Sequence, residues 1–282
     1  MKIGYLGPPG SYSHEAACQY SANVAKDVQL IALPTFSAII EGVERGVIAN
    51  GIIPIENSTH GAVAVAMDSL VNLNNSTVCG EVVLNIEHYL LSANGVDNEI
   101  KYVFSHEQAL GQCREFFLNR YPHIEFIQCG STSQACELAK KNGSTYGAIA
   151  GKPAAKLYGL KVAAENVQDN DYNQTRFLII GSTPPAPTGQ DKTSIVFAFH
   201  DDCPGSLFGV MKAFATRDIN LTRIESRPAK HTMGKYIFYI DFNGHAKEEA
   251  CQAALQNIAG QVSWLKILGS YPSGPISKPT GQ

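Results

Sequence analysis

Short apolar runs alternate with longer amphipathic stretches over the first two thirds of the chain. Each run is typical of a buried strand, and the stretch that follows it carries apolar residues at helical spacing. The predicted strand–helix pairs are 2–6 with 13–26, 51–55 with 60–73, 101–104 with 107–121, 124–129 with 133–143, and 145–150 with 152–159. This repetition predicts an α/β fold with a largely parallel sheet.

A proline-containing segment ends this pattern. Residues 181–193 hold three prolines and two glycines among small polar residues. Such a composition is typical of an extended connection between domains. We therefore expect a first domain over residues 1–182 and a linker over residues 183–192.

The C-terminal part has a different order of elements. Residues 194–200 alternate as a strand, and residues 205–218 carry apolar side chains at helical spacing. Two strands, a helix and a last strand follow, at 219–228, 235–242, 248–260 and 262–268. This βαββαβ order predicts a ferredoxin-like sandwich over residues 193–272, followed by a tail at 273–282. Such a domain leaves a sheet edge or a helical face open, so we expect it to pair with a second copy.

Length and composition exclude several classes of protein. A chain of 282 residues suggests about two domains, and its 44% hydrophobic and 17% charged residues are ordinary for a soluble globular protein. The net charge of −3 predicts no nucleic-acid partner, and no apolar run approaches the ~18 residues that span a membrane. The chain starts without a secretory signal, and its seven cysteines lack zinc-ligand spacing. We therefore expect a cytoplasmic protein with reduced thiols and no metal.

Polar residues gather where the predicted strands end. In parallel α/β sheets, ligands bind beyond the carboxyl ends of the strands, where the next helices begin. After the first strand, Gly7 and Gly10 permit a tight turn, and Ser13 is a good helix N-cap. A helix N-terminus suits a carboxylate or a phosphate, although such a turn can also be purely structural. The sequence does not have the Gly-Lys-Ser/Thr ending of a Walker loop.

Two further clusters follow the strands at 51–55 and 101–104. Residues 56–61 combine a carboxylate, an amide, two hydroxyls and a histidine, although they can also be a capped helix start. Ser105 and His106 occupy the next junction, and Gln112 lies about two turns into the helix that follows.

A fourth cluster precedes the apolar strand at 177–180. Asn173, Thr175 and Arg176 stand at its entrance, where either a structural polar cluster or a ligand must satisfy them. A strand that enters where the others leave must run antiparallel to them or belong to a different lobe. The residues alone thus predict a two-lobed binding protein or enzyme for a small polar or anionic molecule.

Six short motifs along the chain are recognisable in this order: GPPGSYSHEAA, PIENSTHGAV, SHEQALGQC, NQTRF, PGSLFGV and IESRP. Together they resemble the prephenate dehydratase family with a C-terminal regulatory ACT domain, over nearly the whole chain. Tyr12 stands where that family commonly has Phe, and Glu107 where it often has Pro. No helical chorismate mutase segment precedes residue 1, so we expect a monofunctional enzyme.

The resemblance implies a catalytic domain like a periplasmic binding protein, with lobes at 1–78 plus 160–182 and at 79–159. The active site between them would convert prephenate to phenylpyruvate, CO2 and water in L-phenylalanine biosynthesis, without metal or organic cofactor. Thr175 is implied as the catalytic residue, because its hydroxyl can donate a hydrogen bond to the departing oxygen. Arg176 would anchor a carboxylate or form a structural ion pair. The other expected substrate-binding residues are Glu56 (as an organising group), Asn57, Ser58, Ser105, His106, Gln112, Asn173 and Ser13.

The resemblance also implies feedback control by L-phenylalanine and a homodimer or homotetramer formed through the ACT domain. The expected effector residues are Gly205, Ser206, Leu207, Phe208, Asn220, Leu221, Glu225, Ser226, Arg227 and Pro228. Two alternatives stay open at this point. One is an arogenate dehydratase, which acts on the aminated substrate, and the other is a non-catalytic amino-acid-sensing binding protein.

Overall fold

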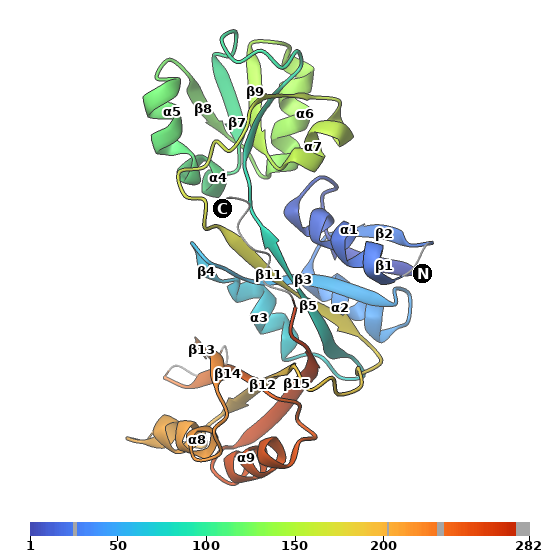
Figure 1. Cartoon of the computed structure of the whole chain (residues 1–282), viewed down its shortest axis with the longest axis vertical. Helices are drawn as coiled ribbons and strands as arrows, with labels where there is room; N and C mark the ends of the chain where they lie inside the picture. The colour runs from blue at the N-terminus through green and yellow to red at the C-terminus, as the bar shows by residue number, and fades with distance from the viewer. Residues whose placement is uncertain (25–26, 202, 230–233, 275–282) are drawn as a thin grey trace.

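The computed structural model describes residues 1–24, 27–201, 203–229 and 234–274. They form three units stacked along the long axis of the molecule, each built on one β-sheet (Figure 1). The last two residues of the helix expected at 13–26, and the expected tail from residue 275 onward, lie outside the described residues.

The first lobe comprises β1 (Lys2–Leu6), α1 (Tyr12–Val24), β2 (Gln29–Leu33), α2 (Phe36–Glu44), β3 (Asn50–Asn57), β4 (Gly61–Ala62), α3 (Ala64–Leu70), β5 (Thr77–Asn85) and β11 (Gln174–Gly181). Its sheet has the order β2-β1-β3-β11-β5, with β4 beside β3. β1 pairs in parallel with β2 and β3, as the strand–helix repeat predicts. β11 runs antiparallel to β3 and β5, so the first of the two alternatives for the strand at 177–180 is the one observed.

The second lobe comprises β6 (Tyr89–Ser92), β7 (Tyr102–Ser105), α4 (Glu107–Gln112), α5 (Arg114–Arg120), β8 (Glu125–Gln128), α6 (Thr132–Asn142), β9 (Tyr146–Ala150), α7 (Lys152–Tyr158) and β10 (Lys161–Ala164). Its sheet has the order β10-β6-β9-β7-β8. The single helix expected at 107–121 is two helices, because the backbone leaves helical geometry at Cys113, with φ of −118°.

The lobe boundaries differ from the expected ones. β5 belongs to the first sheet although most of it lies beyond residue 78, and β10 belongs to the second sheet although it follows residue 160. The chain therefore crosses between the lobes at residues 86–88 and 165–173. The reason is non-local pairing: β5 is held by β11, which comes about ninety residues later in the chain, and no local pattern encodes that partner.

The C-terminal domain comprises β12 (Asp191–Ala198), α8 (Ser206–Ala215), β13 (Leu221–Pro228), β14 (Tyr236–Asn243), α9 (Glu249–Ala259) and β15 (Trp264–Pro272). The predicted βαββαβ order is confirmed, in an antiparallel sheet of order β13-β14-β12-β15. β12 begins within the linker expected at 183–192, so the connection to this domain is shorter than predicted.

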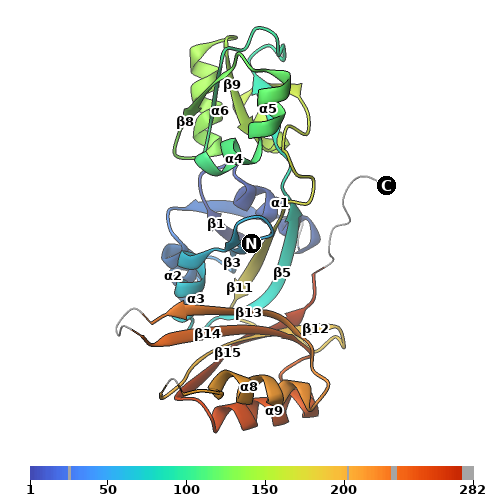
Figure 2. The same ribbon diagram turned by 90° about the vertical axis from the view of Figure 1, so that its left-hand side faces the viewer.

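Both faces of the C-terminal sheet are covered (Figure 2). Phe197 and Phe242 pack under α8 and α9, whereas Tyr239 and Tyr271 pack against the first lobe. Burial of each such aromatic side chain stabilises the fold by about 1.5–3 kcal/mol. The contact is close at Gly269, where a Cβ would collide with the Val78 carbonyl. The domain is therefore packed directly onto the sheet that contains β11.

The described part of the chain has neither a membrane-spanning helix nor a cluster of metal-ligating side chains. None of its helices is both long and apolar enough to cross a membrane. Its His, Cys, Asp and Glu side chains do not gather in threes where they could hold a metal ion.

Candidate active site

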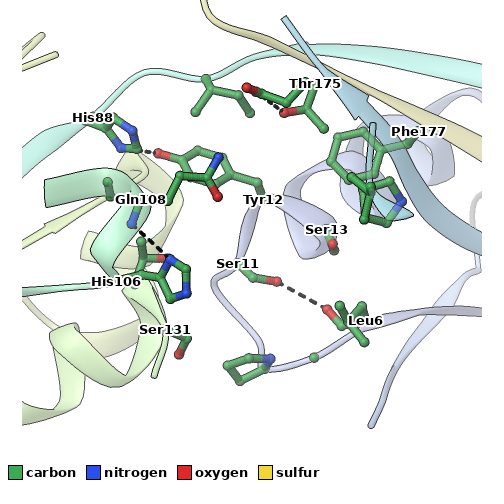
Figure 3. A pocket seen from close by; sticks show the side chains of 18 of the residues that line it. Leu6, Ser11, Tyr12, Ser13, His88, His106, Gln108, Ser131, Thr175 and Phe177 are labelled. Atoms are coloured by element: carbon green, nitrogen blue, oxygen red, sulfur yellow. Dashed lines mark hydrogen bonds between the residues drawn. The ribbon is translucent and has the colours of Figure 1, made fainter. Parts of the chain in front are cut away.

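A cavity of about 380 Å³ lies between the first and second lobes (Figure 3). The first lobe lines it with the turn after β1, the start of α1, the end of β3 and the start of β11. The second lobe lines it with α4 and the start of α6. The lining residues are Leu6, Gly7, Pro8, Ser11, Tyr12, Ser13, Pro54, Asn57, Val63, Ile86, His88, His106, Gln108, Ala109, Gln112, Gly130, Ser131, Thr132, Thr175 and Phe177.

The Thr175 hydroxyl is held in the wall of this cavity by Asn57. The two residues lie opposite each other on β11 and β3, and Asn57 Nδ2 donates to Thr175 Oγ1 over 2.9 Å. Because Thr175 is the acceptor in this bond, its own proton can be donated to a ligand. The structure thus places side by side two residues that belong to separate polar clusters in the sequence.

The amide of Asn57 has one defined orientation. Its Oδ1 accepts hydrogen bonds from the backbone N–H groups of Thr59 and His60, both over 3.0 Å. Backbone N–H groups can only donate, so Nδ2 must face Thr175 and, over 2.7 Å, Asn173 Oδ1. The strand-end cluster at 56–61 thus serves to fix a donor that points at Thr175.

The hydrogen-bond network continues from Asn173 through Gln112 to His88. With Asn173 Oδ1 already an acceptor, Asn173 Nδ2 donates to Gln112 Oε1 over 3.1 Å. His88 Nε2 lies 2.7 Å from the same Gln112 oxygen and must therefore carry a proton. The Tyr12 hydroxyl has one proton and two acceptors within reach, the Glu87 carbonyl at 2.9 Å and the unprotonated Nδ1 of His88 at 2.7 Å.

Burial keeps this chain of hydrogen bonds uncharged. Burial lowers the pKa of His88, although its contact with Gln112 acts in the opposite direction. Burial also raises the pKa of Tyr12 well above its usual value, and the Glu15 charge adds to that effect. Both groups are therefore neutral at physiological pH. The result is a rigid line of donors and acceptors from Tyr12 to Thr175.

Arg176 does not reach the cavity. Its guanidinium lies on the opposite side of β11, where it donates to Glu81 over 2.6 Å, to Asp241 over 2.6 Å and to Glu56 over 3.0 Å. It also donates to the Tyr271 hydroxyl over 2.8 Å. Side chains alternate along a strand, so the neighbour of a cavity-facing Thr175 points away from it. Of the two roles expected for Arg176, this geometry favours the structural ion pair and opposes the carboxylate anchor.

The charge cluster around Arg176 joins the first lobe to the C-terminal domain. Burial alone would lower the pKa of Arg176, but Asp241 and the other anionic groups raise it, so it stays charged. Burial opposes the charge on Asp241, yet Arg176 and Arg223 hold the pKa of that carboxyl below its usual range. Glu56 accepts from both Arg176 and Arg223, and its organising role stays a prediction.

Two other expected substrate ligands use their hydroxyls inside the protein. Ser105 is fully buried and donates to the Ile149 carbonyl over 2.7 Å. Ser58 donates to the Tyr172 carbonyl and accepts from the Gln174 N–H, both over 2.9 Å. Neither is among the lining residues, so this geometry opposes direct contact with a ligand and makes both residues supports of the cavity wall.

The remaining expected residues lie at the cavity. His106, Gln112 and Ser13 line it directly. Asn173 is buried behind the lining and touches it through Gln112 and Asn57. His106 also caps α4, where its ring accepts from the Gln108 N–H over 3.3 Å.

Sequence reasoning missed His88, Tyr12, Ser131 and Thr132. Ser131 and Thr132 follow the strand at 124–129, so the strand-end rule applied elsewhere would have found them. His88 is a lone histidine in the apolar run IEHYLL, at a crossing between lobes that no sequence pattern marks.

Fold and cavity together define the class of two-lobed α/β proteins that have a cavity between their lobes. A family model described as prephenate dehydratase matches residues 3–185. The chain therefore belongs to the prephenate dehydratase family, and it is an enzyme of that family.

Relatives cover nearly the whole chain. A prephenate dehydratase of Methanocaldococcus jannaschii is 36% identical over 95% of this chain and 97% of its own. A bifunctional chorismate mutase/prephenate dehydratase of Aquifex aeolicus is 37% identical over 99% of this chain and 75% of its own. The crystal structure of an Arthrobacter aurescens prephenate dehydratase in complex with L-Phe has a TM-score of 0.88. It is 31% identical and covers 96% of this chain and 90% of its own.

Proposed function

We propose that this chain converts prephenate to phenylpyruvate, CO2 and water in the cavity between its lobes. The observation that carries the proposal is the Thr175 hydroxyl, which Asn57 holds in the cavity wall over 2.9 Å. Family membership supports the reaction, and the geometry supports the residue that assists it.

The reaction needs little covalent chemistry from the protein. The bond from the ring to its carboxylate breaks, its electron pair enters the ring, and the ring hydroxyl leaves on the opposite side as an aromatic ring forms. Thr175 donates a hydrogen bond to that departing oxygen, where negative charge develops, and solvent supplies the proton that completes water. The apolar lining residues Pro54, Val63 and Phe177 provide surroundings that favour loss of the carboxylate charge as CO2.

A direct assay tests this proposal against the two alternatives. Purified protein is mixed with prephenate, and the absorbance of phenylpyruvate is followed with time. A non-catalytic sensor would bind without forming phenylpyruvate, and an arogenate dehydratase would act on arogenate with the greater kcat/KM. Absence of turnover with both substrates would contradict the proposal.

We further infer that the C-terminal domain is an ACT domain that binds L-phenylalanine and pairs with a second copy. The complex of the Arthrobacter relative with L-Phe supports this proposal. Gly205 begins α8 at a positive φ of 88°, and Phe208 is 68% exposed beside it. A helix start with an adjacent open apolar side chain suits the carboxylate and ring of an amino acid.

The expected effector residues on β13 lie on both faces of this strand. Arg227 binds Asp68 of the first lobe over 2.9 Å, and Glu225 lines a separate cavity between this domain and the first lobe. Ser226 and Ile224 occupy the alternate positions, on the face that carries α8 and α9. We therefore assign effector contact to Ser226 and the α8 start rather than to Arg227.

The regulatory proposal has its own test. L-Phenylalanine is titrated into the prephenate assay, and molar mass is measured by light scattering with and without it. We expect altered activity and a dimer or tetramer. If L-phenylalanine changes neither activity nor mass, the effector assignment is wrong.

A further inference from the structure

Two helices that face the cavity begin with the same local sequence and the same hydrogen bonds. Residues 10–13 read Gly-Ser-Tyr-Ser before α1, and residues 130–133 read Gly-Ser-Thr-Ser before α6. In the first, Ser11 Oγ accepts from the His14 N–H over 3.3 Å, and His14 Nδ1 accepts from the Gly10 N–H over 3.1 Å. This is a reciprocal helix cap.

The second helix start repeats this cap in the other lobe. Ser131 Oγ accepts from the Gln134 N–H over 3.0 Å, and Gln134 Oε1 accepts from the Gly130 N–H over 2.8 Å. In each case the serine side chain satisfies the third helical N–H. The first two N–H groups of each helix have no intrahelical partner, as in any helix.

The two helix starts lie close together across the cavity. A Cβ built on Gly10 would lie 3.5 Å from Ser133 Oγ, and the Tyr158 hydroxyl donates to the Pro9 carbonyl over 2.7 Å. Ser11 and Ser131 come from facing walls of the cavity (Figure 3). The positive ends of two helix dipoles therefore point into one space.

Ser13 supplies an independent sign of a ligand. It is 8% exposed and lines the cavity, and within the described part of the chain no group hydrogen-bonds to its hydroxyl. Among the described residues, the fully buried side-chain oxygen without a partner is instead Ser133 Oγ at the start of α6, which costs free energy unless a ligand or water satisfies it. Ser13 presents a free donor at the start of α1.

The cavity lining contains neither Lys nor Arg among the described residues. A dianionic substrate must then be held by neutral donors and helix ends. Arg176, the cation nearest in sequence to Thr175, is committed to carboxylates on the other side of β11.

We propose that the starts of α1 and α6 form one paired carboxylate subsite, with Ser13 and Thr132 as its side-chain donors. This inference rests on the proposed function, and it assigns the subsite to the side-chain carboxylate that phenylpyruvate retains. The carboxylate attached to the ring leaves as CO2. Tight binding of this group would stabilise a charge that the reaction removes, and would therefore slow the reaction.

The test adds a negative charge to each half of the subsite without disturbing its helix. Ser13→Asp and Thr132→Asp are each compared with the isosteric neutral variants Ser13→Asn and Thr132→Asn. Aspartate at a helix N-terminus stabilises the helix itself, so weaker binding would not reflect unfolding. Asn23→Asp adds the same charge at the far, exposed end of α1 as a control.

Two readouts are measured for each folded variant. KM and kcat are determined with prephenate, and the affinity for phenylpyruvate is determined by isothermal titration calorimetry. We expect each Asp variant to raise KM by a factor of about ten or more over its Asn partner, as for like charges placed within a few ångströms. Phenylpyruvate affinity should fall by a similar factor, kcat should change less, and Asn23→Asp should match the wild type.

The outcomes separate this inference from the proposed function. Equal KM and equal phenylpyruvate affinity in the Asp and Asn pairs would overturn the subsite while prephenate turnover continues. An effect in one lobe alone would overturn the pairing of the two helix starts. If the wild type does not turn over prephenate but the Asp variants still lose phenylpyruvate affinity, the subsite stands and the proposed reaction fails. If Ser13→Asp does not fold, Ser13→Ala, which removes the hydroxyl without adding a charge, replaces it, and unchanged KM and phenylpyruvate affinity in that variant would overturn the α1 half of the subsite.

Discussion

Thr175 and Arg176 are neighbours on β11, yet their side chains serve two different parts of the molecule. Thr175 Oγ1 lies 2.9 Å from Asn57 Nδ2 in the cavity between the lobes. Arg176 Nη1 lies 2.6 Å from Asp241 of the C-terminal domain. One strand therefore carries both the proposed catalytic hydroxyl and the main ionic contact with the proposed regulatory domain.

Removal of the Thr175 hydroxyl should slow turnover far more than it weakens binding. We expect Thr175→Ala to lower kcat by a factor of about 10²–10³, as for loss of one donor to a developing oxyanion. Thr175→Ser keeps the donor and should retain much of the activity. Steady-state phenylpyruvate formation measures both, with the exposed Thr145→Ala as a control. Near-normal kcat in Thr175→Ala would remove this residue from its role.

Removal of the Arg176 charge should destabilise the protein more than it affects substrate binding. Arg176→Met leaves Glu81 and Asp241 buried without their main partner, which should cost about 3–5 kcal/mol in the free energy of unfolding. Urea unfolding measures this loss, and KM for prephenate should change little in the folded fraction. A large rise in KM with unchanged stability would instead restore Arg176 as a substrate anchor.

His88 should make stability depend on pH in the acid range. Its pKa is lowered in the folded protein, so the unfolded chain binds a proton more readily, and stability falls as pH drops below about 6.5. His88→Gln removes this proton uptake and keeps a donor for Gln112. Its free energy of unfolding should therefore fall less between pH 7 and 5 than that of the wild type. Urea unfolding at several pH values measures the slopes, with the exposed His123→Gln as control. Parallel wild-type and His88→Gln curves would contradict the neutral state of His88.

Glu15 should affect stability in the opposite direction. Burial, with a contribution from Glu87, raises its pKa to about 7. The folded protein then holds a proton that the unfolded chain has already released, so this contribution to stability is lost as pH rises through about 7. Glu15→Gln should be more stable than the wild type at pH 8, and the difference should shrink toward pH 4. Thermal unfolding across this range checks the sign, and an advantage largest at pH 4 would refute it.

Prephenate should be preferred over arogenate. The described residues that line the cavity include neither Asp nor Glu to pair with the ammonium group of arogenate, and the helix starts disfavour a cation. We expect kcat/KM to be at least about tenfold higher for prephenate, which corresponds to roughly 1.4 kcal/mol between the transition states. Parallel assays with both substrates measure the ratio. A preference for arogenate would show that the ammonium group finds a partner.

The polar clusters at strand ends indicate where the cavity lies. They do not indicate which of their side chains line it. Asn57, Gln112 and Thr175 lie at the cavity because strand ends and helix starts converge there. Ser105 and Ser58 lie in the same clusters, yet their hydroxyls satisfy nearby backbone groups instead. A hydroxyl near a site can serve either purpose, and local sequence does not say which acceptor lies within its reach.

Five strand–helix pairs of the first domain, the βαββαβ order of the C-terminal domain and the family motifs were readable from the sequence, because each depends on local spacing and composition, whereas β2, α2, β5, β6 and β10 were not predicted. Tertiary structure decided the lobe boundaries, the tautomer of His88 and the divergence of Thr175 from Arg176. Successive side chains on a β-strand point to opposite faces of the sheet, so Thr175 and Arg176 must point in opposite directions. The packing of the C-terminal domain against one face of that strand determines which of them meets the ligand cavity.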